Sequence, residues 1–239
     1  MKLAVVLSWL GRMLPPACPL CGGTFSVSVA DPFCSRCMAS VTPLPAAHCS
    51  HCALPFVVSS AEAPHLCGRC IQAPPAYSMA YAAALYEGSL RTAIGCLKFH
   101  QRPNLDRPLA RLIEARLPAL LEVDLLVPVP LYPARLRERT YNQAWLLARE
   151  LGRRRRLPAT HDVLVKRRAT EPQQTLSALQ RRENLRGAFA LNRDVTGKKI
   201  LLVDDVMTTG VTLDLCSRVL LAAGAERVDV AVVARAPLP

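Results

Sequence analysis

The sequence predicts an α/β domain with a parallel sheet flanked by helices, preceded by a small cysteine-rich module. Two observations carry this prediction. Eight of the ten cysteines lie within the first 70 residues, where apolar periodicity is weak. From Tyr77 onward, apolar strand-like stretches alternate with helical ones, as in domains built from strand–helix repeats. A chain of 239 residues is long enough for both parts.

The composition excludes two broad classes of protein. With 51% hydrophobic residues, the chain can bury a core, which an intrinsically disordered chain cannot do. No apolar run approaches the ~20 residues that a transmembrane helix needs. The formal net charge of +12 predicts a basic surface that attracts phosphate groups.

Residues 1–17 form an apolar lead-in, which we expect to be a short amphipathic helix packed on the protein. Lys2 followed by the apolar run 3–10 imitates a signal peptide. Arg12 interrupts that run early, and the stretch 15–18 is a poor site for cleavage or lipidation. We therefore expect the protein to stay in the cytoplasm.

Residues 18–71 form the cysteine-rich module. Its cysteines fall into four pairs with C-x-x-C spacing, which places two thiolates on one tight turn facing one tetrahedral ion. A disulfide framework is the alternative in a secreted protein. Because the module can bury little core, metal must hold it together. The sequence predicts a double zinc ribbon with two structural zinc ions, whose ligands are Cys18, Cys21, Cys34, Cys37, Cys49, Cys52, Cys67 and Cys70.

Two pairings of these cysteine pairs remain open. In the sequential pairing, the first and second pairs hold one ion and the third and fourth hold the other. In the crossed pairing, the first and third pairs share an ion, as do the second and fourth. We favour the sequential pairing because its topology is simpler. His48, His51 and His65 lie nearby, but eight thiolates already complete two closed sites, so we do not expect these histidines to be ligands.

Residues 77–239 form the α/β domain, which follows a proline-containing linker at 72–78. Apolar strands are predicted at 123–130, 199–204 and 228–233. The second is apolar along its length, as is typical of a central parallel strand. Helices are expected over residues 87–98, 107–121, 142–156, 176–185 and 212–223.

The strongest chemical signal follows the strand 199–204. This strand ends in two adjacent acids, and a loop rich in Thr and Gly leads into the next helix. Ligands of open α/β sheets bind at this end of the strands. Backbone N–H groups at a helix start favour a phosphate, and paired carboxylates suit the vicinal hydroxyls of a ribose. The predicted contacts come from Asp204, Asp205, Val206, Met207, Thr208, Thr209, Gly210 and Thr212.

The same stretch resembles the phosphoribosyl diphosphate signature of the type I phosphoribosyltransferases. Four further stretches, at 127–131, 135–144, 173–177 and 181–189, look like the ComF branch of that superfamily. A cysteine-rich front end is also typical of ComF proteins. The sequence differs from the usual ComF pattern at Thr140, where Gly is common, and at Ala178, where a basic residue is common.

The resemblance implies roles for individual residues. In the family, the acidic pair contacts the ribose hydroxyls, the following loop holds the 5′-phosphate, and Mg²⁺ accompanies the diphosphate. Arg135 suits the diphosphate, because a guanidinium donates forked hydrogen bonds; a solvated face is the alternative. Lys98 either complements a helix end or reaches the ligand, since ComF proteins commonly carry Lys-Phe there. Asn142 and Gln143 suit diphosphate oxygens or simply cap a helix.

The arginine run 153–156 has two interpretations. It is either a solvated helix end or a surface that binds the backbone of nucleic acid. No aromatic residue interleaves with the run, so any contact there would be to phosphate rather than to bases.

Two functions follow. The first is a protein that binds phosphoribosyl diphosphate, acts in DNA uptake or in nucleotide metabolism and, if it is an enzyme, transfers the pentosyl group. The second is a non-catalytic accessory factor that binds single-stranded DNA or docks other proteins through its zinc ribbons. ComF relatives are associated with DNA uptake in natural transformation, so single-stranded DNA and other competence proteins are candidate partners.

Overall fold

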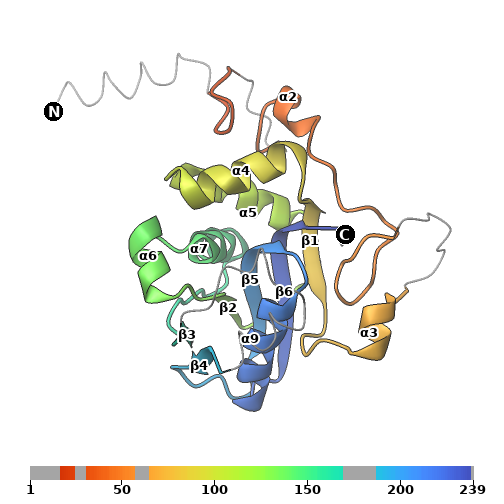
Figure 1. The fold of residues 1–239 in the computed structure, drawn as a ribbon, viewed down its shortest axis with the longest axis vertical. Coiled ribbons are helices and arrows are strands. Elements are labelled where there is room, and N and C mark those ends of the chain that lie inside the picture. The colour runs from red at the N-terminus through yellow and green to blue at the C-terminus, as the bar shows by residue number, and fades with distance from the viewer. Residues whose placement is uncertain (1–16, 25–30, 57–64, 169–186, 238–239) are drawn as a thin grey trace.

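The computed structural model describes residues 17–24, 31–56, 65–168 and 187–237. A four-stranded sheet with the order β1-β6-β5-β2 lies at its centre (Figure 1). Every strand pairing in this sheet is parallel, and helices flank it, which confirms the predicted fold class. The strands are β1 (Ala80–Leu85), β2 (Leu125–Pro128), β5 (Lys199–Met207) and β6 (Arg227–Arg235).

The two central strands, β5 and β6, are buried on both faces. Along β5, Ile200 and Leu202 contribute to one hydrophobic core, whereas Leu201 and Val203 contribute to the other. This alternation follows from the two-residue period of a strand. A strand covered on both sides needs apolar residues at nearly every position, and the sequence of β5 supplies them.

Helices cover both faces of the sheet (Figure 1). Among the described residues of the α/β domain, one face carries three helices, and the other carries one helix and an antiparallel hairpin. The first three are α4 (Gly88–Phe99), α5 (Asp106–Glu114) and α7 (Gln143–Arg155); opposite them lie α9 (Val211–Ala222) and the hairpin of β3 (Leu164–Lys166) and β4 (Phe189–Leu191). A seven-residue helix, α6 (Pro133–Arg139), and the 3-10 turn Pro103–Leu105 complete this domain.

The predicted elements differ from the structure at several places. The expected helix at 107–121 ends at Glu114, shortly before Pro118, which cannot continue a helix. The predictions did not include β1, the β3–β4 hairpin or α6. The expected helix at 176–185 lies outside the described residues, and so does nearly all of the lead-in 1–17.

The cysteine-rich module divides over the two faces of the sheet. Leu20 and Phe33 of its first half join the core beneath α4, α5 and α7. Leu44 and Ala53 join the opposite core, which includes the inner side of α9. The module also contains two short helices that start directly after a cysteine, α2 (Ser35–Met38) and α3 (Gly68–Gln72).

Between the two halves, the chain runs antiparallel along the outer edge of β1. The backbone N–H of Leu44 donates to the carbonyl of Ala83 at 3.3 Å, and the N–H of Leu85 donates to the carbonyl of Thr42 at 2.9 Å. An uncovered edge strand invites pairing with other chains. The module therefore closes one edge of the sheet.

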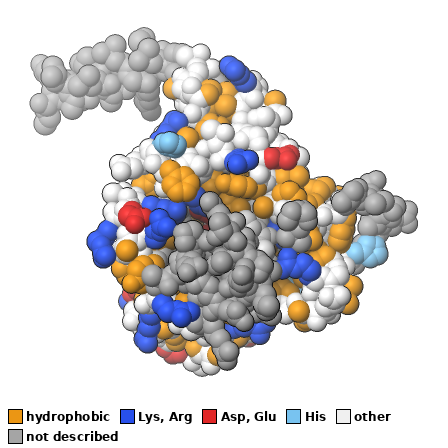
Figure 2. All heavy atoms as spheres, in the orientation of Figure 1, with side chains coloured by type: hydrophobic (Ala, Val, Ile, Leu, Met, Phe, Trp, Pro, Cys, Tyr) orange, Lys and Arg blue, Asp and Glu red, His pale blue; other side chains and the backbone are white. Residues whose placement is uncertain are grey.

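The surface is basic and mixed. Figure 2 shows Lys and Arg side chains in several separate places on one face, among hydrophobic ones. Within the described residues, no helix has both the length and the apolar character needed to cross a membrane.

Substitutions at two glycines of α4 would test how tightly the cysteine-rich module packs on the α/β domain. Gly88 has φ +52°, and a Cβ there would lie 2.1 Å from the carbonyl oxygen of Ser40. We expect Gly88→Ala to lower the free energy of unfolding by about 2–4 kcal/mol, from backbone strain and the clash. Apart from the backbone of α4 and the two neighbours in sequence, no heavy atom of the described residues lies within 4 Å of a Cβ added at Gly95, on the same helix.

The matched control is Gly95→Ala, which we expect to stabilise the protein by about 0.5–1 kcal/mol through helix propensity. Chemical denaturation of both variants measures the two effects. An equal change in the free energy of unfolding in the two variants would contradict the packing of Ser40 against the start of α4.

Candidate metal centres and ligand-binding site

The eight paired cysteines form two clusters in the sequential pairing. Cys18, Cys21, Cys34 and Cys37 make one group, and Cys49, Cys52, Cys67 and Cys70 make the other; within each group the ligand atoms lie within 4.8 Å of one another. The Sγ atoms of Cys21 and Cys34 are 3.7 Å apart, as are those of Cys52 and Cys67. A tetrahedral zinc with Zn–S bonds of about 2.3 Å needs sulfur atoms about 3.8 Å apart. The sulfur positions therefore fit zinc.

In each cluster, a backbone N–H group donates to one cysteine sulfur and stabilises its thiolate form. The N–H of Cys34 points to the Sγ of Cys18 at 3.4 Å, and the N–H of Cys67 points to the Sγ of Cys49 at 3.3 Å. Burial opposes ionisation of these thiols, but the backbone donors outweigh it. They lower the pKa of Cys18 to about 6 and the pKa of Cys49 to about 7. Thiolates are the form that binds metal.

The nearby histidines are engaged elsewhere. Nδ1 of His48 lies 2.7 Å from the carbonyl oxygen of Pro45, and Nε2 of His51 lies 2.5 Å from the carbonyl oxygen of Tyr77. A ring nitrogen bonded to a carbonyl must carry the proton. Neither histidine belongs to a cysteine cluster among the described residues.

We expect two zinc ions per chain. Four thiolates gathered around one ion satisfy a structural zinc site, and the described residues contain two groups of four cysteines whose sulfur atoms lie within 4.8 Å of one another. Elemental analysis of protein purified without added metal should give close to two. Little metal together with disulfide-bonded cysteines by mass spectrometry would contradict both centres. Chelation of the metal should unfold the module, because binding and folding are coupled.

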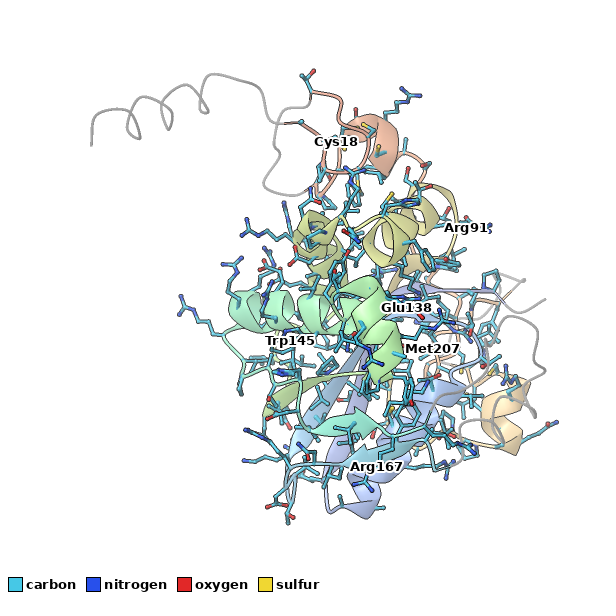
Figure 3. The ribbon with its side chains drawn as sticks, turned by 60° about the vertical axis from the view of Figure 1, so that its left-hand side comes forward. Cys18, Arg91, Glu138, Trp145, Arg167 and Met207 are labelled. Carbon is cyan, nitrogen blue, oxygen red and sulfur yellow. The ribbon has the colours of Figure 1, made fainter. Side chains whose placement is uncertain are left out.

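A cavity of about 730 Å³ opens at the carboxyl ends of β2 and β5. It is lined by all ten residues that the sequence predicted to contact a phosphoribosyl ligand. These residues come from separate elements and the loops that follow them. Figure 3 shows Glu138, on α6, and Met207, at the end of β5, two residues that line the cavity.

The acidic pair lies on the floor of this cavity. Nζ of Lys98, at the end of α4, is 2.7 Å from Oδ1 of Asp205, which is buried. The backbone N–H of Asp205 donates to Oδ1 of Asp204 at 2.8 Å. Burial and the neighbouring Asp205 carboxylate raise the pKa of Asp204 to about 7, against the attraction of Lys98. Burial opposes the charge of Lys98, but Asp205 outweighs it and raises the pKa of Lys98.

The loop after the acids turns into α9 at Gly210. This glycine has φ +79°, and its peptide precedes the first helical residue, Val211. A Cβ at this position would meet the hydroxyl of Tyr77 at 3.4 Å. The left-handed conformation and the close approach both favour glycine. The carbonyl of Gly210 accepts from the N–H of Asp214 at 2.9 Å, so the first turn of α9 begins at the loop.

The arginine-rich segment after β2 is a helix, α6, which the sequence did not predict. Arg135 lines the cavity and pairs with Glu138 at 2.9 Å. Arg139 also lines it; its guanidinium donates to Oε1 of Gln143 at 3.2 Å and lies 5.0 Å from the centre of the Phe99 ring. Arg137 is not among the lining residues.

Thr140 directly follows α6 and has φ +67°. A β-branched residue in this left-handed region is strained, at a cost of about 1–3 kcal/mol. The glycine that ComF proteins usually carry there avoids this cost. Thr140 therefore adopts the backbone conformation that suits glycine, and its side chain makes this conformation strained. The other departure, Ala178, lies outside the described residues.

The two amides that follow have different roles. Asn142 caps α7, accepting from the N–H of Ala144 at 3.0 Å and donating to the carbonyl of Val129 at 3.0 Å. Gln143 is 2% exposed and lines the cavity. Within the described part of the chain, its Nε2 atom has no hydrogen-bond partner. A buried donor of this kind is costly unless a ligand or water accepts from it.

Sequence reasoning missed Lys166 as a residue of this site. It ends β3 and lines the cavity, with its Nζ 5.6 Å from the centre of the Phe189 ring on β4. Burial lowers the pKa of Lys166. The hairpin brings this cation to the cavity, and a short strand far from the acidic motif offered no spacing that could have indicated it.

The arginine run at the end of α7 contacts its own chain. Arg153 pairs with Glu150 at 2.7 Å, and Arg154 pairs with Glu114 at 2.5 Å. Arg155 donates to the carbonyls of Pro118 and Ala119. These contacts favour the interpretation of the run as a helix end.

Comparison with known proteins agrees with this architecture. Residues 9–71 match the double zinc ribbon domain, and residues 144–238 match the phosphoribosyl transferase domain. Competence protein F of Haemophilus influenzae is 33% identical over 92% of this chain and 96% of its own length. The chain belongs to the ComF/YhgH family.

Two further relatives are similar to this chain over different lengths. DNA utilization protein YhgH of Escherichia coli O157:H7 is 36% identical, over 94% of this chain and 94% of its own length. Competence protein ComFC of Bacillus subtilis is 37% identical over a shorter stretch, 41% of this chain and 39% of its own length. The family match agrees with the resemblance seen in the sequence.

Proposed function

We propose that this ComF family protein binds phosphoribosyl diphosphate in the cavity at the end of β5. The observation that carries the proposal is the loop from Asp204 to Thr212, which lies between a buried parallel strand and the start of α9. N–H groups at the start of α9 favour the 5′-phosphate. The Asp204 carboxylate accepts hydrogen bonds from the ribose hydroxyls.

Cations on the other sides of the cavity suit the diphosphate. Arg135 and Arg139 approach from α6 and Lys166 from β3, whereas Lys98 of α4 lies beside the acidic pair, paired with Asp205. Guanidinium groups donate in forked, charge-assisted pairs to phosphate oxygens. The buried Nε2 of Gln143 supplies a further donor. The ligand thus spans from the α9 loop to α6.

Mg²⁺ would enter with the diphosphate. The carboxylate oxygens of Asp204 and Asp205 are the hard donors that this ion prefers, and the metal would supply charge neutralisation of the leaving diphosphate. In a pentosyl transfer, the bond from C1 of the ribose to the diphosphate oxygen breaks and a nucleophile bonds to C1. The residues of this chain would position the ligand and stabilise charge.

The titration of Asp204 tests this assignment. A protonated carboxyl cannot accept the same hydrogen bonds as a carboxylate, so affinity for phosphoribosyl diphosphate should fall as the pH drops below about 7. Asp204→Asn should lower the affinity about 10- to 150-fold, the equivalent of about 1.5–3 kcal/mol for bonds to a charged group. The same variant should lose the part of the pH dependence that belongs to Asp204. Calorimetry across a range of pH measures both effects.

The control is Asp229→Asn, which changes another buried aspartate, at the opposite end of the sheet. Asp229 pairs with Arg227 at 3.2 Å and does not line the cavity. Its replacement should leave affinity unchanged. Equal affinity of the Asp204→Asn variant and the unchanged protein would refute the placement of the ribose.

A role with DNA is the second candidate. The relatives are named as competence and DNA utilization proteins, and we propose that this chain acts in the same process, with single-stranded DNA as a partner. The net charge of +12 attracts a phosphate backbone. We place the DNA contacts on Arg135 and Arg139, because both line the cavity whose chemistry suits phosphate groups, whereas the arginine run at 153–155 lies at the end of α7.

The salt dependence of the affinity for single-stranded DNA distinguishes the surface at Arg135 and Arg139 from the arginine run at 153–156. For a single strand, log K falls with log salt at a slope of about −0.7 for each phosphate neutralised. Changing Arg135 and Arg139 to Gln should flatten the slope by about 1.4 units. Changing the four arginines at 153–156 to Gln should leave it unchanged. A flatter slope in the second variant, measured by fluorescence anisotropy, would move the DNA surface to the end of α7.

A further inference from the structure

Arg235, the last residue of β6, is a buried cation outside the cavity. Its side chain is 1% exposed and is one of the largest fully buried side chains of the described structure. A buried guanidinium is costly unless its donors are satisfied. The partners of Arg235 are backbone carbonyls from two different parts of the chain.

On one side, Arg235 holds the loop that leads to α9. A terminal nitrogen of its guanidinium donates to the carbonyl of Met207 at 3.0 Å and to the carbonyl of Thr208. The same nitrogen donates to the carbonyl of Ala236 at 2.7 Å. Met207 and Thr208 line the cavity, whereas Arg235 does not. These carbonyls therefore point away from the space where the ligand would lie.

The orientation of these carbonyls determines where the next N–H groups point. In a planar trans peptide, the N–H points opposite to the preceding carbonyl. The carbonyl of Met207 also accepts from the backbone N–H of Ala236 at 2.9 Å, so Arg235 reinforces that bond and directs the carbonyl of Thr208. The N–H groups of Thr208 and Thr209 then point away from Arg235, toward the cavity that both residues line. Two successive N–H groups facing the same way form an anion-binding arrangement.

On the other side, Arg235 holds the second cysteine cluster. Its Nε donates to the carbonyl of Cys52 at 3.0 Å. A small cavity of about 70 Å³ lies between this cluster and the loop, lined by Cys52, Cys67 and Cys70 and by Thr209, Gly210 and Arg235. Four thiolates around a divalent cation are anionic as a group, so the loaded cluster stabilises the buried guanidinium beside it.

We propose that Arg235 is a positioning residue that turns the N–H groups of Thr208 and Thr209 toward the phosphate of the ligand and links them to the second zinc cluster. The first cluster has no such link among the described residues, since its attachment through Arg102 reaches the carbonyls of Pro19 and Leu20 only. This inference rests on the proposed function, because it names the residue that prepares the phosphate site. It also gives the second ribbon a role beyond stability.

Arg235→Lys is the direct test, because lysine keeps the charge but lacks the fork that reaches both the ribbon and the loop. The matched control is Arg102→Lys, the same substitution beside the first cluster. Calorimetry with ribose 5-phosphate probes the phosphate loop without the diphosphate. We expect Arg235→Lys to lower the affinity at least tenfold while two zinc ions remain bound, and Arg102→Lys to leave it within twofold.

A spectroscopic measurement separates positioning from a merely structural role. Protein loaded with ¹¹³Cd should give one resonance for each cysteine cluster, assigned through correlations to the cysteine protons. Titration of the unchanged protein with ribose 5-phosphate should shift the resonance of the second cluster and leave the first in place. In the Arg235→Lys variant, saturation with the same ligand should no longer shift the second resonance.

The outcomes separate the two proposals. If the unchanged protein binds neither ribose 5-phosphate nor phosphoribosyl diphosphate, the proposed function fails and this inference fails with it. If the unchanged protein binds and Arg235→Lys binds equally well, only the inference fails. It also fails if both lysine variants lose affinity equally, or if the ligand shifts neither cadmium resonance of the unchanged protein.

Discussion

Two separate groups of four sulfur atoms hold together a stretch of chain that has little core of its own. The apolar side chains of this stretch, such as Leu20 and Phe33 in the first half and Leu44 in the second, pack into the cores of the α/β domain. The two four-cysteine clusters are consistent with structural zinc sites, and a cation there would offset the repulsion between four neighbouring thiolates. The module and the domain thus depend on each other.

The sheet depends on this module to cover the outer edge of β1. β1 pairs with β6 on one side only, and its other side would be open without the segment from Thr42 to Leu44. β1 also carries the chain to Tyr86 and α4, and α4 delivers Lys98 to the acidic pair. The segment from Thr42 to Leu44 therefore supports the strand that leads into the helix carrying Lys98.

The sequence supports prediction best where one continuous stretch encodes both structure and chemistry. β5, the acidic pair and the loop to α9 follow one another without a gap, and the structure places them together as expected. β1 was not predicted because its sequence, AYAAAL, is rich in alanine, which favours helices over strands. α6 was not predicted because its arginines and short length show no apolar period.

Other residues of the site could not be predicted because only tertiary packing brings them there. Lys166 reaches the cavity through a three-residue strand, and the contacts of Arg235 depend on the docking of the second ribbon. Gln143 lies in a motif that the sequence did indicate, but its burial and its lack of a partner within the described residues are properties of the fold. In each case the residue type is informative only once its neighbours are known.

The place of β6 in the sheet has a consequence for how the protein is made. β6 is the last of these strands in chain order, yet it lies between β1 and β5. A ribosome releases the segments of β1, β2 and β5 before it releases the strand that joins β1 to the other two. The cysteine module can bind its metal during that interval, because its ligands lie within the first 70 residues. The α/β domain must wait for β6, and until then its unpaired apolar strands are exposed to aggregation.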